Sequence, residues 1–297
     1  MSLKQISFSK SHNVEFYKTL QLRVREYFKE TKKSRFANTN MVIKTAFMIS
    51  LYLVPFILLL TVIENYWVSF LMWLIMGFGM AGIGLSIMHD ANHGAYSKNK
   101  NVNKILGFII TAVGGSDVNW RIQHNILHHT YTNVSGMDED INPGKVMRFS
   151  PHEKRYPLHK YQHIYAWFLY GLMTLMWCTV KDYRQAVRYN KMDLMKTQGI
   201  TFKRLLTSII ISKVVYFMVI LGLPILFSSL PWWLTIIGFL AMQFIAGLIL
   251  GMIFQPAHVV TTSTYMLPDE SGNIDADWAV NQLFNTANFA PKARLFS

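Results

Sequence analysis

The sequence predicts an all-α integral membrane protein in which four transmembrane helices form two hairpins that carry a cytoplasmic helical cap. Only 15% of the 297 residues are charged and 52% are hydrophobic, whereas a soluble domain carries about 25% charged residues. Four apolar stretches are long enough to cross about 30 Å of hydrocarbon as helices. They lie at 42–63, 67–88, 206–227 and 232–254. Short turns, Glu64–Tyr66 and Ser228–Pro231, join each pair into a predicted hairpin.

The order of these elements divides the predicted single domain, residues 1–297, into five segments. They are an amphipathic N-terminus at 1–41, the first hairpin at 42–88, a central region at 89–205, the second hairpin at 206–254 and a tail at 255–297. Apolar residues recur every four positions from Phe16 to Phe28, which predicts a helix that lies on the membrane surface or packs on the central region. Two shorter apolar stretches, 105–113 and 164–180, predict half-buried or interfacial helices.

Basic residues determine the predicted orientation in the membrane. Of 29 lysines and arginines, nine precede residue 42 and sixteen lie between Lys98 and Arg204, whereas neither hairpin turn holds any. The positive-inside rule therefore places both termini and the central region in the cytoplasm. The net charge of +13 reflects this topology and contact with anionic lipids. Because no RNA- or DNA-reading motif accompanies the charge, no nucleic-acid partner is expected.

Six histidines follow predicted spans or lie in the central region. His89 and His93 are four residues apart, a spacing that puts both rings on one helix face. The second group repeats this spacing and adds an adjacent ring. An even number of predicted spans separates these six histidines, so all six face one side of the membrane. Because imidazole is a common metal ligand, the six predict a metal site. The six are His89, His93, His124, His128, His129 and His258.

The composition of this donor set indicates which metal it suits. Six imidazole nitrogens exceed the four ligands of a structural zinc site and favour two ions instead. The single cysteine, Cys178, excludes thiolate sites and an internal disulfide framework. Iron suits imidazole and can activate dioxygen, whereas zinc is a possible occupant in recombinant samples.

Polar residues beside the histidines are predicted to orient the rings, as outer ligands of metal sites do. They are Asp90, Asn92, Asp138, Asp140 and Gln255. A solvated, helix-capping turn is the alternative for the acidic residues around 138–140. The other four histidines lack partner spacing and predict interfacial packing. They are His12, His152, His159 and His163.

These motifs resemble those of the membrane-bound histidine-box fatty acid desaturases over nearly the whole chain. "HDANHG" is similar to the first histidine box, "QHNILHHTYTN" to the second and "DEDINPG" to the acidic segment that follows it. The front-end subgroup of acyl-lipid and acyl-CoA desaturases is the most similar. The resemblance implies two iron ions held by the six histidines, with His258 matching an extra histidine found after the last span in related enzymes.

The implied reaction is insertion of a cis double bond into a fatty acyl chain with dioxygen, two electrons and two protons. The haem motif HPGG is absent, so an external donor of cytochrome b5 or ferredoxin type is expected. Asn119, Trp120 and Arg121 are candidates for the substrate headgroup, with Arg121 able to meet a phosphate, or else interfacial anchors. A hydroxylase, which would share every motif, stays an alternative.

One departure from the family pattern concerns the third histidine box, a QxxHH or HxxHH element, which the chain lacks. The tail "NTANFAPKARLFS" is similar to the segment just before that box, which indicates a copy that stops short of it. The expectation is a chain that holds metal poorly and turns over little, so an inactive remnant is a second alternative. A metal transporter is disfavoured, because its ligands would lie inside the spans.

Overall fold

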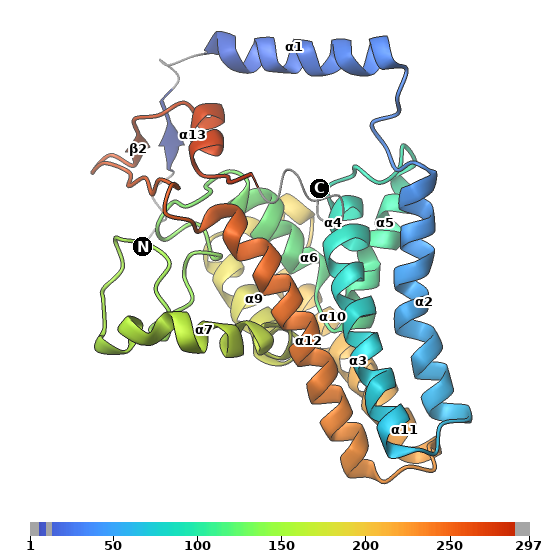
Figure 1. The fold of residues 1–297 in the computed structure, drawn as a ribbon. Coiled ribbons are helices and arrows are strands. Elements are labelled where there is room, and N and C mark those ends of the chain that lie inside the picture. The colour runs from blue at the N-terminus through green and yellow to red at the C-terminus, as the bar shows by residue number, and fades with distance from the viewer. Residues whose placement is uncertain (1–5, 10–13, 289–297) are drawn as a thin grey trace. The chain divides into compact units, whose positions relative to one another are not determined.

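The computed structural model describes residues 6–9 and 14–288, drawn as a ribbon in Figure 1. These residues fold into two compact units. Unit 1 comprises the described residues within 1–35, 123–166 and 252–297, and unit 2 comprises residues 36–122 and 167–251. Each unit is assembled from segments far apart in the chain. The boundaries of the two units therefore differ from those of the five predicted segments. His12 and the tail from residue 289 onward lie outside the described residues.

The described part of the chain confirms the predicted all-α membrane fold. Four helices are long and apolar enough to span a membrane, and a bent pair, 157–171 with 173–191, would add a fifth if it were a single span. Each begins or ends a few residues outside the predicted stretch, because backbone hydrogen bonding continues past the apolar run. The four are Thr39–Thr61, Tyr66–Asn92, Phe202–Phe227 and Trp232–His258.

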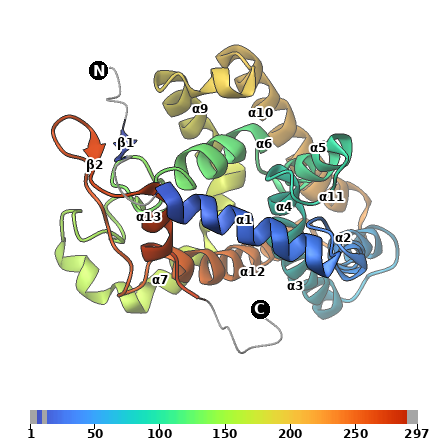
Figure 2. The same ribbon diagram turned by 90° about the horizontal axis from the view of Figure 1, so that it is seen from above.

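The first hairpin of unit 2 consists of α2 (Thr39–Thr61) and α3 (Tyr66–Gly82), which lie side by side (Figures 1 and 2). Asparagines begin both helices. The Asn38 side chain accepts a hydrogen bond from the Met41 amide, and the Asn65 side chain accepts two from the first turn of α3. These caps satisfy amides that a helix start leaves without partners, which permits the short turn.

Two glycines let the apolar helices of unit 2 approach closely. A Cβ at Gly79 of α3 would lie 2.6 Å from the backbone nitrogen of Tyr52 in α2. A Cβ at Gly238 of α12 (Trp232–His258) would overlap the ring of Trp73, which is fully buried. Small residues of this kind allow helix contact where lipid supplies no hydrophobic driving force.

The second predicted span does not end at residue 88. α3 continues into a π-helical segment, η1 (Ile83–Met88), and then into α4 (His89–Asn92). The first histidine motif is therefore part of the same helical rod as the span.

The second hairpin begins with α10 (Phe202–Phe217), η7 (Met218–Gly222) and α11 (Leu223–Phe227), and α12 completes it. The predicted short turn joins them. The interval between the hairpins contains short helices, as predicted for the cap, separated by turns and loops, of which 129–156 is the longest. The short helices are α5 (Lys100–Phe108), η2 (Ile109–Val113), α6 (Asp117–Trp120), η3 (Arg121–His128), η4 (Pro157–Tyr161), α7 (Gln162–Gly171), α8 (Met173–Met176), η5 (Trp177–Lys181), α9 (Asp182–Lys191) and η6 (Leu194–Gln198).

A buried ion pair ties several of these elements together inside unit 2. Lys213 of α10 donates to the carbonyl oxygens of Gly114 (2.6 Å) and Trp177 (2.8 Å) and pairs with the carboxylate of Asp182. Asp182 also accepts from the Trp177 indole (3.2 Å) and lies beside Asn119 of α6. Charged groups in a low-dielectric interior need such complete pairing.

Unit 1 contains the only strands among the described residues. β1 (Ser7–Phe8) pairs in parallel with β2 (Asn273–Ile274), and the two lie side by side in Figure 2. They join the N-terminal segment to the tail. Short α13 (Trp278–Phe284) follows β2 and begins at the capping side chain of Asp277.

The predicted N-terminal helix is present as α1 (Val14–Thr31). Its apolar positions Phe16, Leu20 and Val24 are exposed, and Tyr17 packs edge-on against Trp278 with 5.6 Å between ring centres. Its place at the membrane surface stays a prediction.

Candidate metal centre

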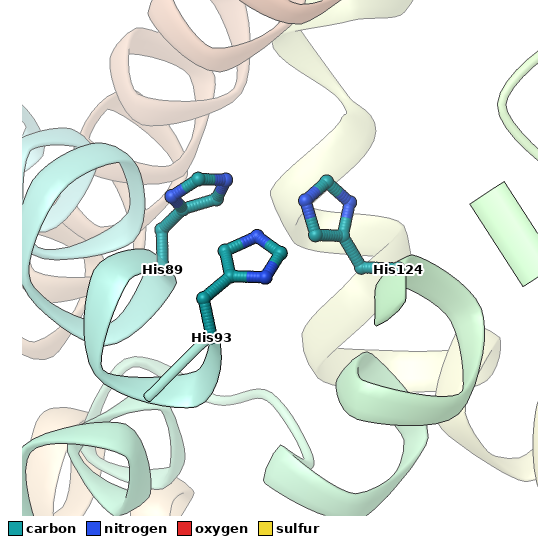
Figure 3. A group of neighbouring side chains, drawn as sticks. All are labelled: His89, His93 and His124. Atoms are coloured by element: carbon teal, nitrogen blue, oxygen red, sulfur yellow. The ribbon is translucent and has the colours of Figure 1, made fainter. Parts of the chain in front are cut away.

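The first histidine pair belongs to unit 2: His89 begins α4, and His93 follows its last residue. The ring centres of His89 and His93 are 4.6 Å apart, and both side chains project to the same side of the helix (Figure 3). The i,i+4 spacing thus presents two imidazoles together, as expected. The third ring in the figure, His124, belongs to unit 1.

An indole supports both rings of this pair. Trp120, at the end of α6, packs edge-on against His89 and against His93, with 5.6 Å between ring centres in each case. Asp90 lies 3.0 Å from Nδ1 of His89, as a carboxylate that orients a ligand ring would. The Asp90 side chain is partly exposed, so its interaction with His89 is screened by water.

Asn92 and Arg121 join the helices behind the first pair. The Asn92 amide donates to the carbonyl of Gly107 (3.1 Å) and its oxygen accepts from Arg121 (3.1 Å). Arg121 also pairs with Asp117 (2.8 Å) and donates to Gln198 (2.8 Å). These contacts of Asn92 and Arg121 all lie within unit 2.

Two predicted headgroup contacts have a different place in the structure. Asn119 is fully buried and donates to the backbone carbonyl of Asp182 (2.8 Å), and Trp120 is buried against the histidines. Arg121 donates from Nε to Gln198 and from Nη1 to Asp117. Contact of these three residues with a substrate headgroup stays a prediction.

The second histidine group lies on η3, a π-helical segment. The His129 amide donates to the carbonyl of His124 (3.0 Å), a bond between residues five apart. The wider turn brings the rings of His124 and His129 to 4.5 Å, whereas His124 and His128 are 5.3 Å apart. The predicted i,i+4 pairing is therefore joined by a closer i,i+5 pair, because π-turns add a residue per turn.

Two carboxylates hold the ring of His128, which is buried. Its Nδ1 lies 3.1 Å from Asp138 and 3.3 Å from Asp140. Asp138 is itself fixed by the backbone amides of Asn133 and Asp140, each at 3.0 Å. Burial alone lowers the pKa of His128, but the hydrogen bond to Asp138 and the charges of Asp140 and Asp138 outweigh it and raise this pKa to about 9.

His258, the last residue of α12, completes the group in unit 1. Its Nε2 lies 3.2 Å from Nε2 of His128, and its Nδ1 lies 2.9 Å from the carbonyl of Asn285. That carbonyl and the Asp138 carboxylate each require a proton on the Nδ1 they face. In the neutral rings, both Nε2 lone pairs then point toward each other, so a proton or a cation must lie between them.

The donor geometry of unit 1 fits a metal ion. Two imidazole nitrogens bound about 2.1 Å from one ion lie about 3.0–3.4 Å apart, close to the 3.2 Å between His128 and His258. Donor atoms of His124, His128 and Asp140 all lie within 4.8 Å of one another. Asp140, predicted only to orient a ring, is therefore placed as a potential ligand.

Several supporting residues had no signal in the sequence. One of them is Gln123, which donates to the carboxylate of Asp140 (2.7 Å). Gln255, by contrast, was predicted to support the rings, and it donates to the Asp140 carbonyl (3.3 Å). Asn133, which has a left-handed φ of 59°, donates to the carbonyl of His258 (2.9 Å). No motif spacing relates Asn133 or Asn285 to His258.

Comparison with known proteins gives the family. The fatty acid desaturase family profile matches residues 65–296. The chain belongs to the fatty acid desaturase family. The predicted resemblance is confirmed, and with it the activity of an oxidoreductase that desaturates fatty acyl chains.

Relatives of this desaturase are similar over most of its length. The sn-1 linoleoyl-lipid 6-desaturase of Synechocystis sp. is 32% identical, and the alignment covers 98% of this chain and 80% of the relative. The enzyme of the same name from Arthrospira platensis is 30% identical, covering 97% and 76%. The acyl-lipid (8-3)-desaturase of Physcomitrium patens is 31% identical, covering 97% and 60%. No solved structure matches the chain.

The raised pKa of His128 predicts that metal binding to the desaturase releases a proton. Below pH 9 the metal-free ring carries both protons, so an ion must displace the one on Nε2, and apparent affinity should rise about tenfold per pH unit up to about pH 9. Calorimetric titration in two buffers of different ionisation enthalpy counts this proton at pH 7.5. Asp138→Asn should remove most of the release, and equal release in both proteins would contradict this origin.

Proposed function

We propose that this desaturase inserts a cis double bond into an acyl chain of a membrane lipid at a pair of iron ions. The observation that carries the proposal is the pairing of His128 and His258, whose nitrogens face each other at 3.2 Å beside two carboxylates. The ions would be held by His89, His93, His124, His128, His129 and His258. This proposal replaces the earlier expectation of a chain that holds metal poorly. Bound iron would supply the oxidant for an unactivated C–H bond, using dioxygen and electrons.

The Asp138 carboxylate fixes the tautomer of His128 that would bind a metal ion. Accepting from Nδ1, the carboxylate directs the Nε2 lone pair outward, and the two backbone amides keep the carboxylate in place. The carbonyl of Asn285 does the same for His258. A carboxylate or carbonyl behind each ring also raises the basicity of the ligand nitrogen.

The proposal requires the histidines of both units to share one centre. Support comes from the motif spacing, which repeats the i,i+4 interval in both groups, and from the fatty acid desaturase family to which the chain belongs.

Orientation and partners complete the proposal. The distribution of basic residues supports cytoplasmic termini and cytoplasmic histidines. Electrons would come from an external donor of cytochrome b5 or ferredoxin type. The names of the relatives, linoleoyl-lipid and acyl-lipid desaturases, favour a lipid-linked acyl chain over acyl-CoA.

Lipid analysis of cells that express the chain tests this function. Host cells that lack polyunsaturated acyl chains are supplied with linoleate, and a second culture expresses His128→Ala. We expect new double bonds from the unaltered chain alone, seen as a loss of two hydrogens, in intact lipids before any free or CoA-linked pool. A gain of oxygen instead would indicate a hydroxylase, and no product from the unaltered chain would contradict the proposal.

A further inference from the structure

A groove of about 660 Å³ runs along one side of unit 2. α10 and η7 form one wall, and α2 together with α5 and η2 forms the other. No part of the proposed metal centre lines it, since every lining residue falls at 52–56, 108–112 or 204–220. The groove therefore needs an occupant of its own.

One continuous helix face forms the first wall. Its residues recur at alternating intervals of three and one from Arg204 to Ile220, the repeat of a single helical stripe. At a rise of 1.5 Å per residue the stripe is about 24 Å long. One leaflet contributes about half of a hydrocarbon core that is about 30 Å thick, so the groove extends past the midplane.

The stripe is polar at one end. Arg204, Thr207, Ser208 and Ser212 line it there, and Thr111 lies on the opposite wall. No acidic residue lines the groove, and no described side chain forms an ion pair with the exposed guanidinium of Arg204. The Thr111 and Ser212 hydroxyls donate to the carbonyls of Phe108 (2.8 Å) and Ile209 (3.0 Å). This end therefore offers an anionic ligand one positive charge together with the hydroxyls of Thr207 and Ser208.

The other end of the stripe is apolar. Val215, Val219 and Ile220 line the first wall, and Leu53 and Phe56 of α2 line the second. Val215 and Val219 are 53% and 41% exposed, so the groove is open along its length to whatever surrounds the helices. In an integral membrane protein that surrounding is lipid.

We infer that this groove binds one anionic glycerophospholipid, with its phosphate at Arg204 and one acyl chain along the apolar end. Charge and polarity both change along the stripe in the order in which they change along such a lipid. A neutral lipid would leave the arginine without an anion, and a water-soluble anion would leave the apolar end uncovered. The inference is independent of desaturation.

Photolabelling of the purified protein in lipid nanodiscs tests this site. The probe is phosphatidylglycerol with a diazirine on one acyl chain, and peptide mass spectrometry locates the label. We expect label on 215–220 and on 53–56. Val215→Trp, which fills the groove, and Arg204→Gln, which removes the charge, should each lower labelling there by about tenfold or more.

Each variant has a matched control on the same helix. Val214→Trp changes a residue of similar exposure (51%) outside the groove, and Lys203→Gln removes a neighbouring charge, so both should label like the parent. Equal labelling of Val215→Trp and Val214→Trp would show ordinary surrounding lipid and overturn the site. Equal labelling by a neutral glycolipid with the same chains would overturn the phosphate assignment.

Discussion

Replacing His128 with alanine should abolish the formation of new double bonds and sharply lower bound iron. The ring lies buried between two carboxylates and His258, so no other described side chain can take its position. Removing a residue that only orients a ligand costs about 10–100-fold in metal affinity, and loss of the ligand itself should exceed this. Lipid profiling measures the product, and elemental analysis of the purified protein measures the iron.

Two further substitutions serve as comparisons for His128→Ala. Asp138→Asn keeps the size of the side chain but removes its charge, so it should fall within that 10–100-fold range. His163→Ala removes an exposed histidine without partner spacing and should leave iron and product unchanged. If His128→Ala kept more than half of the iron and product of the parent, the assignment of this ligand would be wrong.

The second large effect concerns stability. Lys213→Met should lower the free energy of unfolding by about 3–5 kcal/mol, the cost of leaving one member of a buried ion pair alone. Without the lysine, the Asp182 carboxylate would have no counter-ion from α10, and the carbonyls of Gly114 and Trp177 would lose their hydrogen-bond donor. Equilibrium unfolding in detergent micelles measures the difference.

A double variant separates the charge from the packing. Lys213→Met with Asp182→Asn removes the uncompensated charge while the asparagine oxygen can still accept from the Trp177 indole. It should be more stable than Lys213→Met alone. Lys203→Met, at an exposed position of the same helix, should change little. A loss below 1 kcal/mol for Lys213→Met would mean that water or lipid headgroups reach the pair.

Hydropathy and charge were sufficient to predict the spans, because a membrane imposes both length and polarity on every crossing. Lys213 shows the limit of that reasoning. It lies inside a predicted span, and the sequence contains no indication that its partners would be Asp182 and two carbonyls contributed by separate short helices. Such partners depend on tertiary packing.

The histidines could be located from spacing, whereas their supports could not. Asp138 and Asp140 were both predicted to orient rings of the second group, with a helix-capping turn as the alternative. In the structure they differ: Asp138 is fixed by backbone amides, and Asp140 also lies within ligand reach. The π-turn of η3 changes which rings are closest. Neither property follows from residue spacing, because both depend on local backbone geometry.

The most direct test of the central claim is Mössbauer spectroscopy of the protein after anaerobic reconstitution with isotope-enriched ferrous iron. Histidines from both units holding one pair of ions predict two irons per chain and, after oxidation, a magnetically coupled pair that His89→Ala and His128→Ala each disrupt. Uncoupled iron in the parent, or a coupled pair that survives His89→Ala, would contradict a shared centre.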